Sequence, residues 1–164
     1  GLSLTLLGAA MGVRVIAVDI SSERLKLAKS YGADALVNAD IDEPIEAIHG
    51  LTFGHGADYT TECVGLPETR IASIRSTRAW GTTCFVGEGN DVTIDVSRDM
   101  LRRQLTLIGS WTFNTIRQTE CATYCVEHGI DVDQIFTHRY ALDQADEAYK
   151  LFDTQSTGKG VFVF

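Results

Sequence analysis

Asp19 is the residue whose type and position most clearly indicate chemistry. It closes an apolar run over residues 13–18 that is rich in β-branched side chains, a pattern typical of a strand covered on both faces. Ser21 and Ser22 follow as candidate helix caps, and Gly32 would end that helix. An acid between such a strand and helix can accept hydrogen bonds from the two hydroxyls of a ribose, as in nucleotide-binding βαβ units. The alternative is an ordinary carboxylate that caps the next helix.

The surroundings of Asp19 favour one kind of nucleotide. Its charge would repel a 2′-phosphate, and Ile20 behind it offers no cation to bind one, so NAD is favoured over NADP. A small-residue helix over residues 1–12 precedes it, and a dinucleotide fold needs such a helix between its first two strands. If Gly1 is the last glycine of a G-x-G-x-x-G fingerprint, Asp19 falls at the position of its acid, and the first strand lies before residue 1.

Strands and helices alternate along the rest of the chain. The pattern predicts strands at 33–38, 57–64, 82–87, 106–110 and 161–164, and helices at 43–48, 67–78, 115–128 and 143–152. Residues from Val92 to Val96 alternate between apolar and polar side chains and favour an edge strand. We therefore expect one α/β domain over residues 1–164, with a Rossmann-type, doubly wound, mostly parallel sheet and helices on both faces.

Composition limits the classes of partner. The formal net charge of −8 argues against nucleic acid, which needs a basic face, and no apolar run is long enough to span a bilayer. The four cysteines include no C-x-x-C pair, so reduced thiols in the cytoplasm are expected. Cys121 and Cys125 share a helix face but have no further ligand nearby, so no metal site is predicted in this chain.

The whole chain resembles the cofactor domain of the medium-chain dehydrogenases, the zinc-containing alcohol, sorbitol and threonine dehydrogenases. Eight segments match in the family's order and spacing: GLS at 1–3, VIAVD at 15–19, RLKLA at 24–28, YGAD at 31–34, ECVG at 62–65, GTTCFVG at 81–87, LIGS at 107–110 and GKGV at 158–161. The resemblance implies a sheet with the strand order 3-2-1-4-5-6 whose first strand is missing. It also implies a fragment without the N-terminal catalytic domain, which holds the zinc ligands.

Ligands of open α/β sheets bind outside the carboxyl ends of the strands. The resemblance accordingly assigns cofactor contacts to Gly1, Asp19, Ile20, Arg24, Val64, Gly65, Val86, Gly87, Glu88, Ser110, Thr112 and Lys159. Arg24 would lie beside the adenosine and Lys159 near the phosphates, although each is equally typical of a solvated surface side chain. Gly1 would open the helix that faces the pyrophosphate, or it is simply the start of the chain. The later strand ends would surround the ribose and nicotinamide, with core packing as the alternative for the valines.

The resemblance also implies a function for the parent enzyme. It would be an NAD-dependent, zinc-type alcohol or polyol dehydrogenase. This chain would supply its NAD(H)-binding domain, contain no catalytic residue and be inactive alone. A homodimer would form through the edge strand from Val92 to Val96, unless Asp91 and Asp95 protect that edge. Three alternatives stay open: a methyltransferase that uses S-adenosylmethionine, a zinc-free relative of the quinone reductases, and a non-catalytic nucleotide-binding module or inert fragment.

Overall fold

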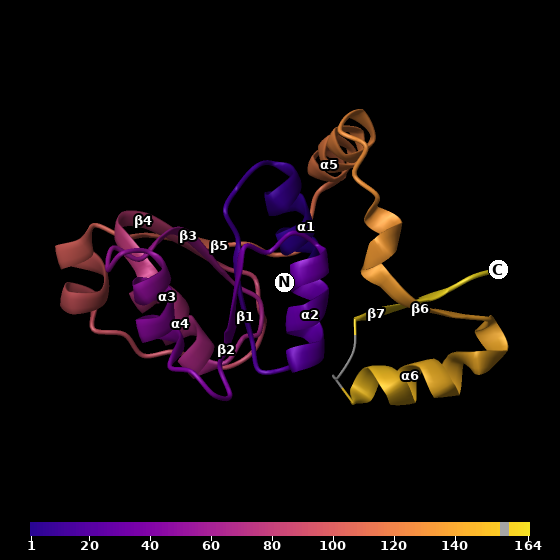
Figure 1. The fold of residues 1–164 in the computed structure, drawn as a ribbon, viewed down its shortest axis with the longest axis horizontal. Coiled ribbons are helices and arrows are strands. Elements are labelled where there is room, and N and C mark those ends of the chain that lie inside the picture. Colours follow the sequence, from indigo (N-terminus) through magenta and orange to yellow (C-terminus); the bar gives the residue numbers. More distant parts are fainter. Residues whose placement is uncertain (155–157) are drawn as a thin grey trace. The chain divides into compact units, whose positions relative to one another are not determined.

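The computed structural model describes residues 1–154 and 158–164, which form two compact units. One unit comprises residues 41–113 together with Gly1, and the other comprises residues 2–40 and 114–164. In each unit parallel strands alternate along the chain with helices, as Figure 1 shows from the N-terminus to the C-terminus. This alternation confirms the predicted α/β class, whereas a single domain over 1–164 stays a prediction.

The unit of residues 2–40 and 114–164 contains two pairs of parallel strands. Its elements are α1 (Leu2–Ala10), β1 (Ile16–Asp19), α2 (Ser22–Ser30), β2 (Ala35–Asn38), α5 (Thr115–Glu127), η3 (Val132–Ile135), β6 (Phe136–Tyr140), η4 (Leu142–Gln144), α6 (Ala145–Asp153) and β7 (Lys159–Phe162). β1 pairs with β2, so that Asp19 lies opposite Asn38, and β6 pairs with β7. β1 has no second partner strand among the described residues.

Local sequence determines where α2 begins and ends. The Ser21 hydroxyl caps its N-terminus by accepting a hydrogen bond from the Arg24 amide at 3.3 Å. Gly32 follows its last turn with a left-handed φ of +98°, as predicted. A Cβ on Gly32 would lie 2.6 Å from the Cβ of Ala9. The absence of a side chain therefore lets α1 pack closely against the end of α2.

The unit of residues 41–113 contains a three-stranded parallel sheet in the order β3-β4-β5. Its elements are α3 (Pro44–Leu51), β3 (Ala57–Glu62), α4 (Pro67–Ser76), β4 (Thr77–Phe85), η1 (Val96–Met100), η2 (Leu101–Arg103) and β5 (Thr106–Gly109). A hydroxyl cluster of Thr60, Thr77 and Thr83 joins β3 to β4, with the Oγ1 atoms 2.7 to 3.1 Å apart. Because these hydroxyls satisfy one another away from water, the cluster favours this register of the two strands.

The edge strand predicted from Val92 to Val96 is wrong for this chain. The described structure has no strand between β4 and β5, and β5 pairs with β4 alone. Val96 instead begins η1, because the Asp95 side chain accepts a hydrogen bond from the Arg98 amide at 3.1 Å and so caps a helical turn. An alternating pattern forms a ladder only where a backbone partner is available, and this segment has none among the described residues.

Two strands also begin away from their predicted positions. β1 begins at Ile16 rather than at residue 13, because the Val13 amide donates to the Gly8 carbonyl at 2.9 Å and closes α1. β4 begins at Thr77 rather than at residue 82, directly after the last residue of α4. The other predicted strands and helices are present with small differences at their ends.

Candidate functional site

Asp19 lies at the carboxyl end of β1, as predicted, with Arg24 beside it. Its Oδ1 accepts hydrogen bonds from the Ser21 amide at 2.9 Å and from Arg24 Nε at 3.0 Å, and Arg24 Nη2 completes the ion pair at 3.0 Å. The two charged side chains are 29% and 27% exposed. Asp19 Oδ2 makes no hydrogen bond to any residue in the described part of the chain. The carboxylate therefore keeps one oxygen for a hydroxyl donor while Oδ1 helps to fix the start of α2.

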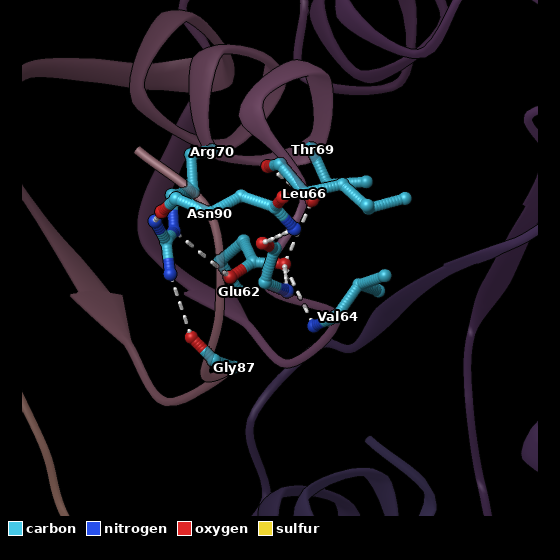
Figure 2. Close-up of polar contacts among 8 residues, drawn as sticks. Glu62, Val64, Leu66, Thr69, Arg70, Gly87 and Asn90 are labelled. Carbon is cyan, nitrogen blue, oxygen red and sulfur yellow. Dashed lines mark hydrogen bonds and ion pairs between the residues drawn. The ribbon is translucent and has the colours of Figure 1, made fainter. Parts of the chain in front are cut away.

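Glu62 organises the carboxyl end of β3, although it was not predicted as a site residue (Figure 2). Its side chain is buried, and Oε1 accepts hydrogen bonds from the amides of Val64 and Gly65 at 2.7 and 2.8 Å. The Thr69 hydroxyl, from α4, donates to the same oxygen at 2.8 Å. A charged acceptor strengthens each of these bonds, so Glu62 holds the loop after β3 against the first turns of α4.

The loops that follow β3 and β4 meet backbone to backbone. The Glu62 carbonyl accepts hydrogen bonds from the amides of Val86 and Gly87 at 2.8 and 3.0 Å. A Cβ on Gly87 would lie 2.3 Å from the nitrogen of Gly65, and a Cβ on Gly65 would lie 2.0 Å from the carbonyl oxygen of Glu88. Gly65 also has a left-handed φ of +88°. Both positions therefore require glycine, which explains these two predicted site residues by packing.

Arg70 of α4 reaches over to the loop after β4 (Figure 2). Its guanidinium donates to the Gly87 carbonyl at 2.9 Å and also to the carbonyl of Asn90, whose side-chain amide donates to Gly65 at 3.1 Å. Arg70 Nε lies 4.0 Å from Glu62 Oε2. These two buried atoms have no hydrogen-bond partner in the described structure, so charge attraction alone compensates their burial.

The remaining predicted residues have different surroundings. The Ser110 amide donates to the Phe85 carbonyl at 2.9 Å, so Ser110 continues the pairing of β5 with β4. Thr112 is exposed and has a left-handed φ of +48°. Lys159 is exposed at the first residue of β7, and Gly1 is exposed with open space where a Cβ would lie. All four residues are thus exposed, and Ser110 alone is held at the strand ends by a hydrogen bond to β4.

Sequence reasoning missed three side chains that hold the loops after β3 and β4. Glu62 could have been predicted from the sequence. It is an acid at the end of a strand, the same pattern that singled out Asp19, and a loop that contains glycine follows it. Arg70 and Asn90 could not have been predicted from the sequence, since their hydrogen-bond partners lie 17 to 25 residues away along the chain.

The cysteines and candidate metal ligands of the described residues are possible reactive groups. Residues 1–154 and 158–164 contain no group of three His, Cys, Asp or Glu side chains that could hold a metal ion. The four cysteines are free. Burial raises the pKa of the Cys84 thiol and Cys63 raises it further, and burial likewise raises the pKa of Cys125 next to Cys121. Both thiols are therefore poor nucleophiles at neutral pH.

No described helix has the length and the apolar character needed to cross a membrane.

Comparison with known proteins identifies relatives along most of the chain. The family model described as zinc-binding dehydrogenase matches residues 1–127. An uncharacterized zinc-type alcohol dehydrogenase-like protein of Escherichia coli is 34% identical over 152 residues, which cover 92% of this chain and 43% of that protein.

Two solved structures have a similar fold. Benzyl alcohol dehydrogenase from Acinetobacter calcoaceticus matches 99% of this chain and 46% of its own, with a TM-score of 0.87 and 27% identity. A zinc-binding dehydrogenase from Sinorhizobium meliloti 1021, bound to NADP, matches 95% of this chain and 46% of its own, with a TM-score of 0.73 and 26% identity. These matches confirm the predicted fold class. The chain spans less than half the length of each relative.

Proposed function

Because the chain belongs to the zinc-binding dehydrogenase family, we propose that it binds NAD(H) as the cofactor domain of an alcohol or polyol dehydrogenase. Asp19 is the observation that carries this proposal. Its carboxylate stands at the carboxyl end of β1, is partly exposed, and has Oδ2 free to accept hydrogen bonds from a ribose diol. The adjoining loops after β3 and β4 support it further, because ligands of open α/β sheets bind outside the carboxyl ends of the strands.

The other predicted residues receive roles under this proposal. Backbone groups near Val86, Ser110 and Thr112 would bind the carboxamide of the nicotinamide, while Val64, Gly65, Gly87 and Glu88 would shape the adjoining loops. Lys159 and the helix that begins after Gly1 would face the cofactor phosphates, and Ile20 would lie beside the adenosine ribose. When bound, the dinucleotide supplies the hydride acceptor of the reaction.

The charges of Asp19 and Arg24 bear on whether the chain prefers NAD or NADP. A relative of known structure is bound to NADP, and Arg24 is a cation beside Asp19. In this chain, however, the Arg24 guanidinium is already paired with Asp19, and the carboxylate would repel a 2′-phosphate. We therefore propose NAD as the preferred cofactor.

Oxidation of an alcohol requires more than the described residues offer. They fit a ribose at Asp19 but include no donor set for zinc. We propose that this chain alone does not oxidise alcohols or polyols with NAD, and that zinc in the parent enzyme binds to residues outside this sequence. An assay of NADH formation by the pure chain checks this point, and turnover above background would contradict it.

The cofactor proposal is tested by titrating the chain with NADH and, in parallel, with NADPH, using calorimetry. We expect saturable binding that is tighter for NADH. Asp19→Asn should weaken NADH binding about tenfold, the loss expected for a charge-assisted hydrogen bond, and should narrow the difference between the two cofactors. Asp40→Asn removes the same charge from an exposed acid near the end of β2 and should leave both affinities unchanged.

Two results would contradict the assignment. Tighter binding of NADPH than of NADH would reverse the role given to Asp19. Binding of S-adenosylmethionine without binding of either dinucleotide would favour a methyltransferase instead.

We also propose a cytoplasmic homodimer. The four unpaired thiols support a reducing compartment, and family resemblance supports the dimer. Because no strand forms from Val92 to Val96, that segment is not assigned as the contact between the two copies. Light scattering after size exclusion measures the oligomeric state, and a monomer at high concentration would contradict the proposal.

A further inference from the structure

A basic cavity lies at the amino ends of the strands in the unit of residues 41–113. Its volume is about 340 Å³, and the charged or titratable side chains that line it are His49, His55, Arg75, Arg98, Asp99 and Arg103. His55 lies two residues before β3 begins, and Arg103 lies three residues before β5 begins. The loops proposed to contact a cofactor follow the carboxyl ends of β3 and β4. Six residues of β3 separate the two regions by about 20 Å.

Three of the basic side chains have a structural role in the cavity wall. Arg103 Nη1 donates to the Ile74 carbonyl at 3.0 Å, and His49 Nε2 lies 3.1 Å from the carbonyl oxygen of Arg75. These are among the last carbonyls of α4, where the helix dipole favours cations. Arg75 itself pairs with Asp99 at 3.1 Å. Helix capping therefore explains His49 and Arg103, and ion pairing explains Arg75.

Arg98 and His55 have no such role. Both residues are exposed, and neither side chain forms a hydrogen bond or an ion pair with a residue in the described part of the chain, although Arg98 lies close enough to Asp99 to lower its pKa. Asp99, the one carboxylate among the lining residues, is already engaged with Arg75 and with the amide of Asp95 at 3.1 Å. Arg98 and His55 therefore line this space with hydrogen-bond donors that no described residue of the chain occupies.

Positive charge in the cavity exceeds negative charge. Three guanidinium groups face one carboxylate in a chain whose net charge is −8. Burial lowers the pKa of the Arg103 guanidinium, Asp99 opposes that change, and the like charge of Arg75 lowers the pKa further. An anion in the cavity would relieve this repulsion and would meet the fork-shaped donors that guanidinium groups offer to phosphate oxygens.

We propose that this cavity binds a small anion that carries phosphate groups, at a site separate from the one proposed for the dinucleotide. Arg98 would be the main contact, with His55 as a second donor in the lining and with Arg75 and Arg103 supplying charge. The volume admits a compact phosphorylated metabolite or pyrophosphate but not a whole dinucleotide. This inference stands independently of the function proposed above, since it uses none of the same residues.

Inorganic pyrophosphate is the probe for this site, titrated into the full chain by calorimetry at constant ionic strength. We expect saturable binding of one pyrophosphate per chain. Arg98→Gln should weaken it about tenfold, as expected for the loss of a charge-assisted contact. Arg102→Gln is the matched control, because Arg102 is an exposed neighbouring arginine outside the cavity lining and its loss should change nothing. Circular dichroism establishes that both variants fold.

Three further results would overturn the proposal. No binding of pyrophosphate would show that there is no site, and equal losses in the Arg98 and Arg102 variants would show attraction to general surface charge only. Displacement of pyrophosphate by saturating NADH would place the anion at the cofactor site. Citrate tests the chemical class, since we expect it to bind at least tenfold more weakly than pyrophosphate, and equal affinity would contradict the assignment to phosphate groups.

Discussion

The buried carboxylate of Asp99 links the stability of the 41–113 unit to pH. It is 1% exposed, and the hydrogen bond from Arg75 holds its pKa below the ordinary value of 3.8, while burial opposes this shift and the amide of Asp95 adds to it. The folded state therefore binds this proton less tightly than the unfolded chain does. The stabilising contribution is complete above the ordinary pKa and is lost as the pH falls through the lower pKa of the folded state.

Replacing Asp99 by Asn tests this account. We expect Asp99→Asn to lower the free energy of unfolding at pH 7 by about 2 kcal/mol, because Arg75 loses a charged partner. As the pH falls below the ordinary pKa of 3.8, the variant should lose less stability than the unmodified chain. Urea unfolding at several pH values measures both effects, with Asp40→Asn as an exposed control. Parallel pH curves for Asp99→Asn and the unmodified chain would contradict the assignment.

Single residues were predictable where their surroundings in the sequence are local. The position of Asp19 at the end of a strand was predicted because the strand before it and the helix after it are contiguous, and Ser21, which caps that helix, was predicted in the same way. Arg24 was named only from the family resemblance. Asp99 was not found, because its ion-pair partner Arg75 lies 24 residues earlier. Such pairs depend on packing between elements, and no spacing rule reveals them.

The backbone contact between the loops after β3 and β4 predicts that a side chain at Gly87 destabilises the chain. Gly87→Ala would bring a Cβ within 2.3 Å of the Gly65 nitrogen, so the two loops must separate. We expect a loss of about 2 kcal/mol in the free energy of unfolding, typical of overpacking, together with weaker NADH binding. Thermal or urea unfolding measures the first effect and calorimetry the second.

Gly50→Ala is the matched control for that variant. Gly50 lies in α3 with no atom within 4 Å of the position of a Cβ, so alanine fits and should raise stability by about 0.5 kcal/mol through helix propensity. Equal effects of the two substitutions would show that backbone contact between the loops is unimportant.

Strands at the edges of sheets were predicted less reliably than strands that alternate regularly with helices along the chain. The segment from Val92 to Val96 has a strand pattern but no backbone partner, whereas β6 (Phe136–Tyr140) was missed although it pairs with β7. Both errors have the same physical origin, because strand formation depends on a partner that is distant in the sequence. Helices such as α2, α5 and α6 depend on local periodicity and caps, and their positions were predicted closely.

For the whole molecule, the sequence determined the fold class but not the basic cavity. Alternation of strands and helices repeats along the chain and identifies a parallel α/β fold even when several boundaries are wrong. The cavity requires α3, α4 and η1 to meet at one place, which only the folded chain reveals. β1 and β3 each pair with a single neighbour, so each leaves one row of backbone groups without a strand partner in the described structure.

The two units can be followed by different spectroscopic signals during unfolding. The chain has two tryptophans, Trp80 and Trp111, and both belong to the unit of residues 41–113. Tryptophan emission is therefore a reporter of that unit alone, whereas far-ultraviolet circular dichroism follows the helices of both. If the units melt independently, the two signals will give different urea midpoints. Coincident midpoints would instead show that the chain unfolds as one cooperative body.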